Sequence, residues 1–187
     1  MIPAHEYAKI ISALTKPLPA YVRYVAKSEV WGIDTSTRVT THFVNGKATP
    51  PVRQGHGPFK HTSDSTNLNS AFVPACYRVV GERIGSWRGK PAVVFSLAPI
   101  CSPKWNSGFP ILYADPHTMR PLFVTVTMGK GQAKATLSEM FGEFNGYILP
   151  TVVKTVLQGR GSASWLQVTM TMLYSRYEFS ATPFMTK

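Results

Sequence analysis

The stretch GHGPFKHTSD, residues 55–64, places two histidines and an aspartate close together in the sequence. Imidazole and carboxylate groups bind zinc and transfer protons, so this stretch is a candidate metal or catalytic site. Zinc needs three or four ligands, and His56, His61 and Asp64 could supply three, with His117 or Asp115 as a further candidate. Nothing in the spacing requires these side chains to meet, and a Gly-Pro pair between the histidines prevents a helix. We therefore expect a solvated loop and no bound metal or cofactor.

The catalytic motifs that the chain suggests are incomplete. His61-Thr62-Ser63 has the H-x-S form that two-histidine phosphoesterases use in pairs, but Met119 replaces the hydroxyl residue after His117. A nucleophile elbow of the form G-x-S-x-G is absent from the sequence. Gly129–Lys134 lacks the P-loop pattern, although its backbone amides could hold one phosphate at the start of a helix. We predict that the protein is not an enzyme, and a hydrolase using His56, His61 and His117 remains an alternative.

Charge is the strongest signal in the composition. Twenty Lys and Arg face nine Asp and Glu, giving a formal net charge of +11. Such an excess favours a polyanionic partner, which is either nucleic acid, RNA or a single strand in particular, or an anionic membrane surface. The basic residues are scattered singly, so the fold must assemble any binding face. The predicted contacts lie in or beside predicted loops and are Arg53, Lys60, Arg83, Arg88, Lys90, Lys130 and Lys134.

Length and cysteine content set further bounds. The 187 residues suit a single domain, 1–187, with one hydrophobic core. Cys76 and Cys101 are too few for a disulfide framework, so we expect two buried thiols in a reducing, cytosol-like compartment, with a single bridge as the alternative. We find no apolar run long enough to span a bilayer and no secretory signal at the start of the sequence.

The first part of the chain changes its hydrophobic period. Apolar residues spaced three and four apart predict an N-terminal helix within residues 1–17, which Pro17 ends. Strict alternation then predicts strands over 21–31 and 37–47, with Asn45-Gly46 as a type I′ turn. Residues 50–71 are polar, lack periodicity and contain Pro50-Pro51, so we expect a long loop there.

The second part predicts more strands and two helices. Strands are expected over 73–80, 90–98, 109–114 and 121–128, with the segment GERIGSWRG as a turn region between the first two. A Thr136-x-x-Glu139 capping box predicts a helix, and a second short helix is expected between Pro150 and Gly159. The last strand begins near Trp165, and its apolar positions change parity after Ser175, which indicates a β-bulge.

These elements predict a mainly β, α+β fold. We expect an antiparallel sheet or β-sandwich of about seven strands, with an N-terminal helix and one or two short helices late in the chain. A regular strand–helix alternation is missing, which excludes a doubly wound fold.

By elimination, the sequence favours a protein that works by stoichiometric assembly. A compact, basic, β-rich chain without catalytic signatures is typical of a viral or phage coat or matrix subunit, which binds genome or anionic lipid and copies of itself. Such a protein is made in the host cytoplasm and resides in the virion. The alternative is a nucleic-acid-binding accessory domain that does not form a shell.

Overall fold

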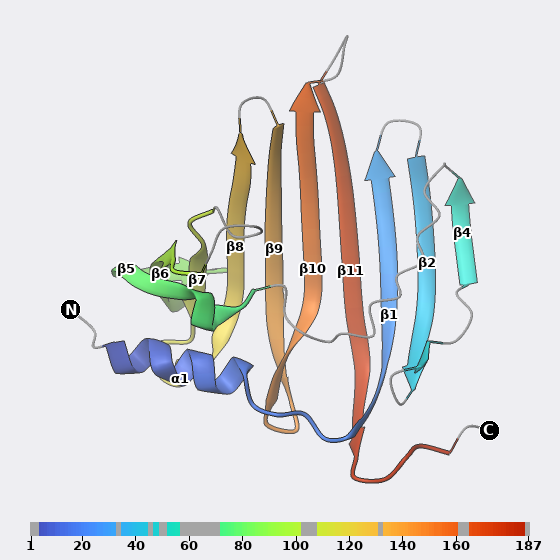
Figure 1. Cartoon of the computed structure of the whole chain (residues 1–187), viewed down its shortest axis with the longest axis horizontal. Helices are drawn as coiled ribbons and strands as arrows, with labels where there is room; N and C mark the ends of the chain where they lie inside the picture. The colour runs from blue at the N-terminus through green and yellow to red at the C-terminus, as the bar shows by residue number, and fades with distance from the viewer. Residues whose placement is uncertain are drawn as a thin grey trace.

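The computed structural model describes residues 4–32, 35–44, 47–48, 52–56, 72–101, 108–130, 133–160 and 165–185. Among these residues, eleven strands form one antiparallel sheet, accompanied by an N-terminal helix and a short 3-10 helix (Figure 1). The elements are α1 (Ala4–Leu14), β1 (Tyr21–Gly32), β2 (Thr35–Val44), β3 (Lys47–Ala48), β4 (Val52–His56), η1 (Pro74–Cys76), β5 (Tyr77–Trp87), β6 (Lys90–Pro99), β7 (Ile111–Ala114), β8 (Pro121–Lys130), β9 (Ala133–Phe144), β10 (Tyr147–Arg160) and β11 (Trp165–Ser180). The predicted mainly β, antiparallel fold is confirmed.

Strand pairing follows the chain with one long-range closure. The order across the sheet is β3-β2-β1-β11-β10-β9-β8-β7-β6-β5, and β4 also pairs with β2. The strands from β5 to β11 therefore form a continuous meander, and β11 pairs with β1 over a long register. In Figure 1 the strands from β8 to β2 are seen face-on, whereas β5, β6 and β7 lie across them at one end, so the sheet curls strongly there.

Helix α1 covers the inner face of the curled end of the sheet (Figure 1). Tyr7 and Ile10 are buried in the main core, where they meet Phe95, Leu97 and Leu112 of the sheet. Burying a side chain of this size contributes about 1.5–3 kcal/mol, so one helix face is enough to hold α1 on the sheet. The predicted N-terminal helix is confirmed. Within the described part of the chain, no helix combines the length and apolarity that a membrane-spanning helix requires.

A second, smaller core lies between β1 and β11. Tyr24 and Ala26 are buried there against Met172, Tyr174 and Tyr177. The β1–β11 register shifts opposite Arg23/Val25, and Arg176 has a φ of 56°, which is the left-handed region. The β-bulge predicted after Ser175 is therefore confirmed. It keeps the aromatic side chains of β11 on one face on both sides of the irregularity.

The two predicted late helices are wrong, because both segments are long strands. The capping-box residues Thr136 and Glu139 lie in β9, which pairs with β8 on one side and β10 on the other. Pro150 lies in β10 beside a register shift in the β9–β10 pairing, where the irregular ladder tolerates a residue without an N–H. Hydrogen bonds from two neighbouring strands outweigh the weak local helix signal.

Two loop predictions also need correction. The segment GERIGSWRG is not a turn region, because β5 continues to Trp87 and only Arg88 and Gly89 turn, with φ values of 50° and 75°. Within the predicted loop 50–71, Val52–His56 form β4 and pair with β2. Residues 57–71 and the predicted turn at 45–46 lie outside the described residues.

The two cysteines form a disulfide, which corrects the expectation of free thiols. Cys76 ends η1, Cys101 follows β6, and their Cα atoms are 4.9 Å apart. A backbone hydrogen bond joins the same two segments, because the Ile100 N–H donates to the Cys76 carbonyl at 2.8 Å. Disulfides form and persist in oxidising compartments, so the expectation of a reducing, cytosol-like compartment is corrected as well.

Candidate functional site

The candidate histidine site, which the sequence left as an alternative, is not assembled by the described residues. His56 lies in β4, beyond β2, while His117 lies in the exposed turn between β7 and β8, and five other strands separate β2 from β7 in the sheet order. His61 and Asp64 are outside the described residues. In the ranges that the structure describes, no group of three or more His, Cys, Asp or Glu side chains could hold a metal ion. The hydrolase alternative therefore has no geometric support.

The seven predicted cations fall in separate parts of the fold. Arg83, Arg88 and Lys90 are exposed on the β5–β6 hairpin. Arg88 is already engaged, because its guanidinium lies 4.4 Å from the Trp87 ring centroid and 3.1 Å from the sulfur of Met140.

The remaining four predicted cations lie elsewhere. Lys130 and Lys134 lie on the facing ends of β8 and β9, whereas Arg53 lies in β4, which pairs with β2 toward the other edge of the sheet. Lys60 is outside the described residues. The described cations thus do not form the single face that was expected, and their contact role stays a prediction.

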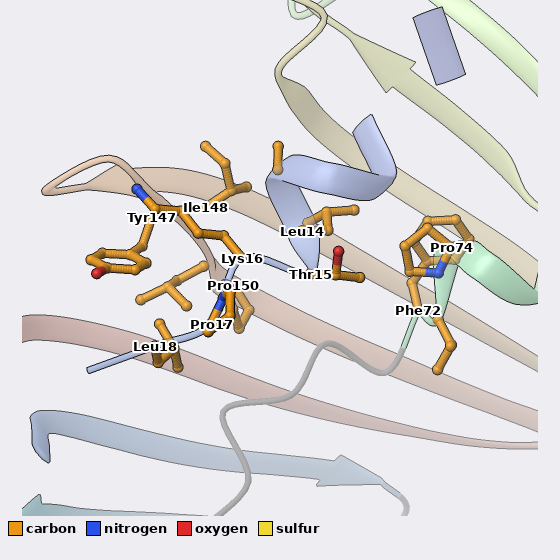
Figure 2. Close-up of a pocket in the computed structure, with 13 residues that line it drawn as sticks. Leu14, Thr15, Lys16, Pro17, Leu18, Phe72, Pro74, Tyr147, Ile148 and Pro150 are labelled. Atoms are coloured by element: carbon orange, nitrogen blue, oxygen red, sulfur yellow. The ribbon is translucent and has the colours of Figure 1, made fainter. Parts of the chain in front are cut away.

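A cavity of about 430 Å³ lies where three segments that are distant in the sequence meet. The segments are 13–18 at the end of α1, 72–74 before and at the start of η1, and 147–150 at the start of β10 (Figure 2). Pro17 prevents the helix from continuing, so residues 16–18 leave α1 without regular structure and line the cavity beside the start of β10. The cavity is open on one side, as a groove with access from solvent.

Apolar side chains make up most of the cavity lining. They include Leu14, Leu18, Phe72, Pro74, Ile148 and Pro150. Figure 2 shows Leu18, Ile148 and Tyr147 on one side of the groove and Phe72 and Pro74 on the other. The polar lining residues are Thr15, Lys16 and Tyr147. The Thr15 hydroxyl donates to the Ile11 carbonyl at 2.8 Å, so the last turn of α1 already uses it.

Buried contacts fix the wall formed by 72–74. The Tyr7 hydroxyl donates to the Pro74 carbonyl at 2.9 Å and joins α1 to η1. The Phe72 N–H donates to a carboxylate oxygen of Glu139 at 3.3 Å, and Glu139 is fully buried in β9. The disulfide holds Cys76 at the far end of η1. This wall is therefore preformed.

Tyr7, which is buried, and Tyr177, which is half-buried, hold the cavity walls as hydrogen-bond donors. Burial raises the pKa of Tyr7 well above the usual tyrosine value, and the nearby Tyr77 raises it further. Burial likewise raises the pKa of Tyr177, whose hydroxyl donates to the Pro150 carbonyl at 2.7 Å. Both hydroxyls therefore stay protonated throughout the physiological pH range, and both support residues that line the cavity.

This cavity was not predicted from the sequence. Its local signals are weak: the run Pro17-Leu18-Pro19 and the run Ile148-Leu149-Pro150 each put apolar side chains beside a proline. Such runs mark places where regular structure ends or bends. Only the tertiary fold shows that residues of both runs line the same groove.

Comparisons with known proteins give likenesses in solved structures only. No family model matches the chain, and no curated protein matches it. A LolA superfamily protein from Nitrosomonas europaea is 12% identical, with 98% of this chain and 96% of that chain covered and a TM-score of 0.46. A domain from Vibrio parahaemolyticus described as an outer membrane lipoprotein-sorting protein is 14% identical, with 93% and 91% covered and a TM-score of 0.48. A chain of the Pseudomonas aeruginosa MucA–MucB complex is 11% identical, with 96% and 99% covered and a TM-score of 0.32. At these values the likeness assigns no ligand or activity to this chain.

The prediction of a viral or phage coat or matrix subunit is wrong. The three similar structures described above are a LolA superfamily protein, a lipoprotein-sorting domain and a MucA–MucB complex, and none of them is a coat or matrix protein. The correction extends to the predicted partners, which were nucleic acid, an anionic membrane surface and copies of the same chain. It also extends to the alternative of an accessory nucleic-acid-binding domain and to the predicted virion location. The charge excess is a poor guide to function here, because net charge describes the surface and says little about what a fold encloses.

Proposed function

We propose that this protein is a binding protein for the hydrocarbon chain of a small amphiphile, which it holds in the groove between α1, residues 72–74 and the start of β10. The observation that carries the proposal is the mostly apolar lining of this 430 Å³ cavity. Small-molecule sites are typically concave, mostly apolar and about 300–1,000 Å³ in volume. The cavity therefore has the size and the chemistry of a small-molecule site.

The polar groups in the lining are too few to recognise a polar ligand by a hydrogen-bond pattern. The Thr15 hydroxyl is used within α1, so only Lys16 and Tyr147 remain as polar side chains among the described lining residues. The driving force available in the groove is therefore apolar burial. That force is proportional to the apolar area removed from water and does not depend on direction, which suits a flexible hydrocarbon chain.

The same lining supports binding without catalysis. The thirteen residues around the cavity include no His, Asp, Glu or Cys side chain that could act as a general acid, base or nucleophile. Lys16 and Tyr147 are the titratable members of the lining. A groove of this kind can shield an apolar chain from water and release it unchanged.

A chain-length series tests the proposed function. Normal alkanols of 8, 9 and 10 carbons, added to protein loaded with the neutral fluorophore N-phenyl-1-naphthylamine, should displace the fluorophore. The dissociation constant should fall about fourfold per methylene, because each buried methylene contributes about 0.8 kcal/mol. Neutral ligands keep electrostatic effects out of the measurement.

A variant pair places the binding in the groove. Leu18→Asp puts a charge into the apolar lining and should weaken alkanol binding at least tenfold, because an unpaired carboxylate disfavours apolar contact. Leu157→Asp is the matched control, since Leu157 is 43% exposed in β10 and does not line the cavity. No displacement of the fluorophore, or a dissociation constant that is independent of chain length, would show that the proposal is wrong.

A further inference from the structure

Lys16 lines the groove, and the β9–β10 turn holds its ammonium group. Its ammonium nitrogen is 2.9 Å from the Gly146 carbonyl oxygen and 4.4 Å from the centroid of the Tyr147 ring (Figure 2). Residues 16 and 146 are 130 positions apart in the sequence, so this contact belongs to the tertiary fold. Lys16 is exposed although it lines the cavity, so its charge stays in water where the groove opens to solvent, which we call the groove mouth.

The turn that receives Lys16 has a defined shape. Asn145 and Gly146 have φ values of 51° and 75°, the pair of left-handed residues that a two-residue type I′ hairpin turn requires. A Cβ atom added at Gly146 would lie 3.4 Å from the Lys16 ammonium nitrogen, so a side chain there would crowd the cation. The turn therefore presents a bare carbonyl and an aromatic face to one lysine.

The charge at the groove mouth is not neutralised by the cavity lining. Among the described residues that line the cavity, Lys16 alone has a side chain that is charged near neutral pH. Nearby ionic groups pair with each other: Lys9 with Glu6 at 3.1 Å, and Arg120 with Glu143 at 3.0 Å. An ammonium carries three N–H donors, and a single carbonyl at 2.9 Å uses one of them. At least one donor therefore remains for a ligand.

From this geometry we infer that the ligand of the groove is an acidic amphiphile, whose anionic head, a carboxylate or a phosphate monoester, pairs with Lys16 while its hydrocarbon chain lies in the apolar groove. This inference rests on the proposed function and adds the class of head group. A charge-assisted hydrogen bond is about twice as strong as a neutral one, and a head group anchored at the mouth directs the chain inward. Lys16 thus selects acids over alcohols of the same chain length.

The decisive measurement compares ligands that differ only in the head group. Decanoate, monodecyl phosphate and 1-decanol compete for N-phenyl-1-naphthylamine near pH 7, where the carboxylate is ionised. Both acids should bind the wild-type protein roughly tenfold more tightly than the alcohol at low salt. This ratio is smaller than a buried ion pair would give, because solvent weakens the interaction with the exposed Lys16. Added salt should reduce this ratio and leave alcohol binding unchanged. A carboxylate preference over phosphate, or the reverse, identifies the head group.

Variants of Lys16 distinguish pairing of its charge with the head group from apolar contact made by its side-chain stem. Lys16→Met keeps an apolar stem and removes the charge, so it should abolish the preference for acids and leave the dissociation constant of 1-decanol within about twofold. Lys16→Arg should retain the preference. Lys9→Gln is the control, since Lys9 is an exposed cation on α1 that does not line this cavity. Thermal unfolding of each variant establishes that it is folded.

The outcomes distinguish the two proposals. Equal binding of decanoate and 1-decanol by the wild-type protein overturns the anchor and leaves the proposed function standing. An acid preference that persists in Lys16→Met overturns the assignment to Lys16. If neither acids nor alcohol displace the fluorophore, the proposed function itself fails.

Discussion

The disulfide between Cys76 and Cys101 should be the largest single covalent contribution to stability in the described fold. It joins the end of η1 to the end of β6 and closes the β5–β6 hairpin at its open side. With 25 residues separating the two cysteines, loss of loop-closure entropy in the unfolded chain predicts a contribution of about 3.5 kcal/mol. For a chain of 187 residues, this corresponds to a fall in Tm of roughly 10 °C when the bond is reduced.

Urea unfolding of the oxidised and the dithiothreitol-reduced protein measures this contribution. The double variant Cys76→Ser, Cys101→Ser should match the reduced wild-type protein and should not respond to dithiothreitol. Because η1 carries Pro74 into the cavity wall, reduction should also weaken binding of N-phenyl-1-naphthylamine. Fluorophore binding and the unfolding midpoint are thus two independent measurements of the effect of this disulfide.

Two results would refute this reasoning. The first is alkylation of both cysteines by iodoacetamide in the native, non-reduced protein, as seen by mass spectrometry, because a disulfide leaves no thiol to react. The second is an unchanged free energy of unfolding after reduction. That result would mean that the β5–β6 pairing already restricts the unfolded chain as much as the covalent bond does.

Three further changes follow from the core and from the described hydrogen bonds. Leu97→Ala should lower the free energy of unfolding in urea by about 2–5 kcal/mol, because Leu97 is fully buried in the main core. The control Leu157→Ala, at an exposed site, should lower it by under about 1 kcal/mol. Equal losses would contradict the placement of Leu97 in the core. Tyr177→Phe removes the donor to the Pro150 carbonyl and should cost about 1–3 kcal/mol in the same assay, and a neutral effect would show that water replaces the bond. Two backbone N–H groups and a hydroxyl lower the pKa of Asp115. Its stabilising effect should therefore be present above the ordinary carboxyl pKa of about 4 and be lost as pH falls through the lower folded-state pKa. Asp115→Ala should flatten this part of the stability–pH curve, and identical curves for the variant and the wild-type protein would refute the effect.

Local sequence patterns predicted the elements at both ends of the chain. The helix of α1 shows three- and four-residue spacing and ends at a proline, and both signals act within a few residues. The alternation in β1 and β11 reflects strands in which one face is more buried than the other. The parity change after Ser175 marks an irregularity in the pairing opposite Arg23/Val25. These features depend on neighbours in the sequence, so a sequence can reveal them.

The same patterns failed for β9 and β10. Leu137, Met140 and Phe141 have helical spacing, but in the sheet Leu137 and Phe141 share a face with Glu139, and Met140 lies on the other face. Both faces of a strand in the middle of this curled sheet are half-buried, so apolar residues occur on both and the alternation disappears. A usable signal existed in β10, where Thr151, Val152 and Val153 are β-branched residues that favour strands.

The sequence alone determined that this protein is mainly β, antiparallel and led by an amphipathic helix, because hydrophobic periodicity is set by the residues within each element. Only the tertiary structure decided that Lys16 meets Gly146, that Cys76 meets Cys101 and that three remote apolar segments enclose a groove. The physical reason is that strand order and sheet curvature bring distant residues together, and neither quantity is encoded in any short window of the chain.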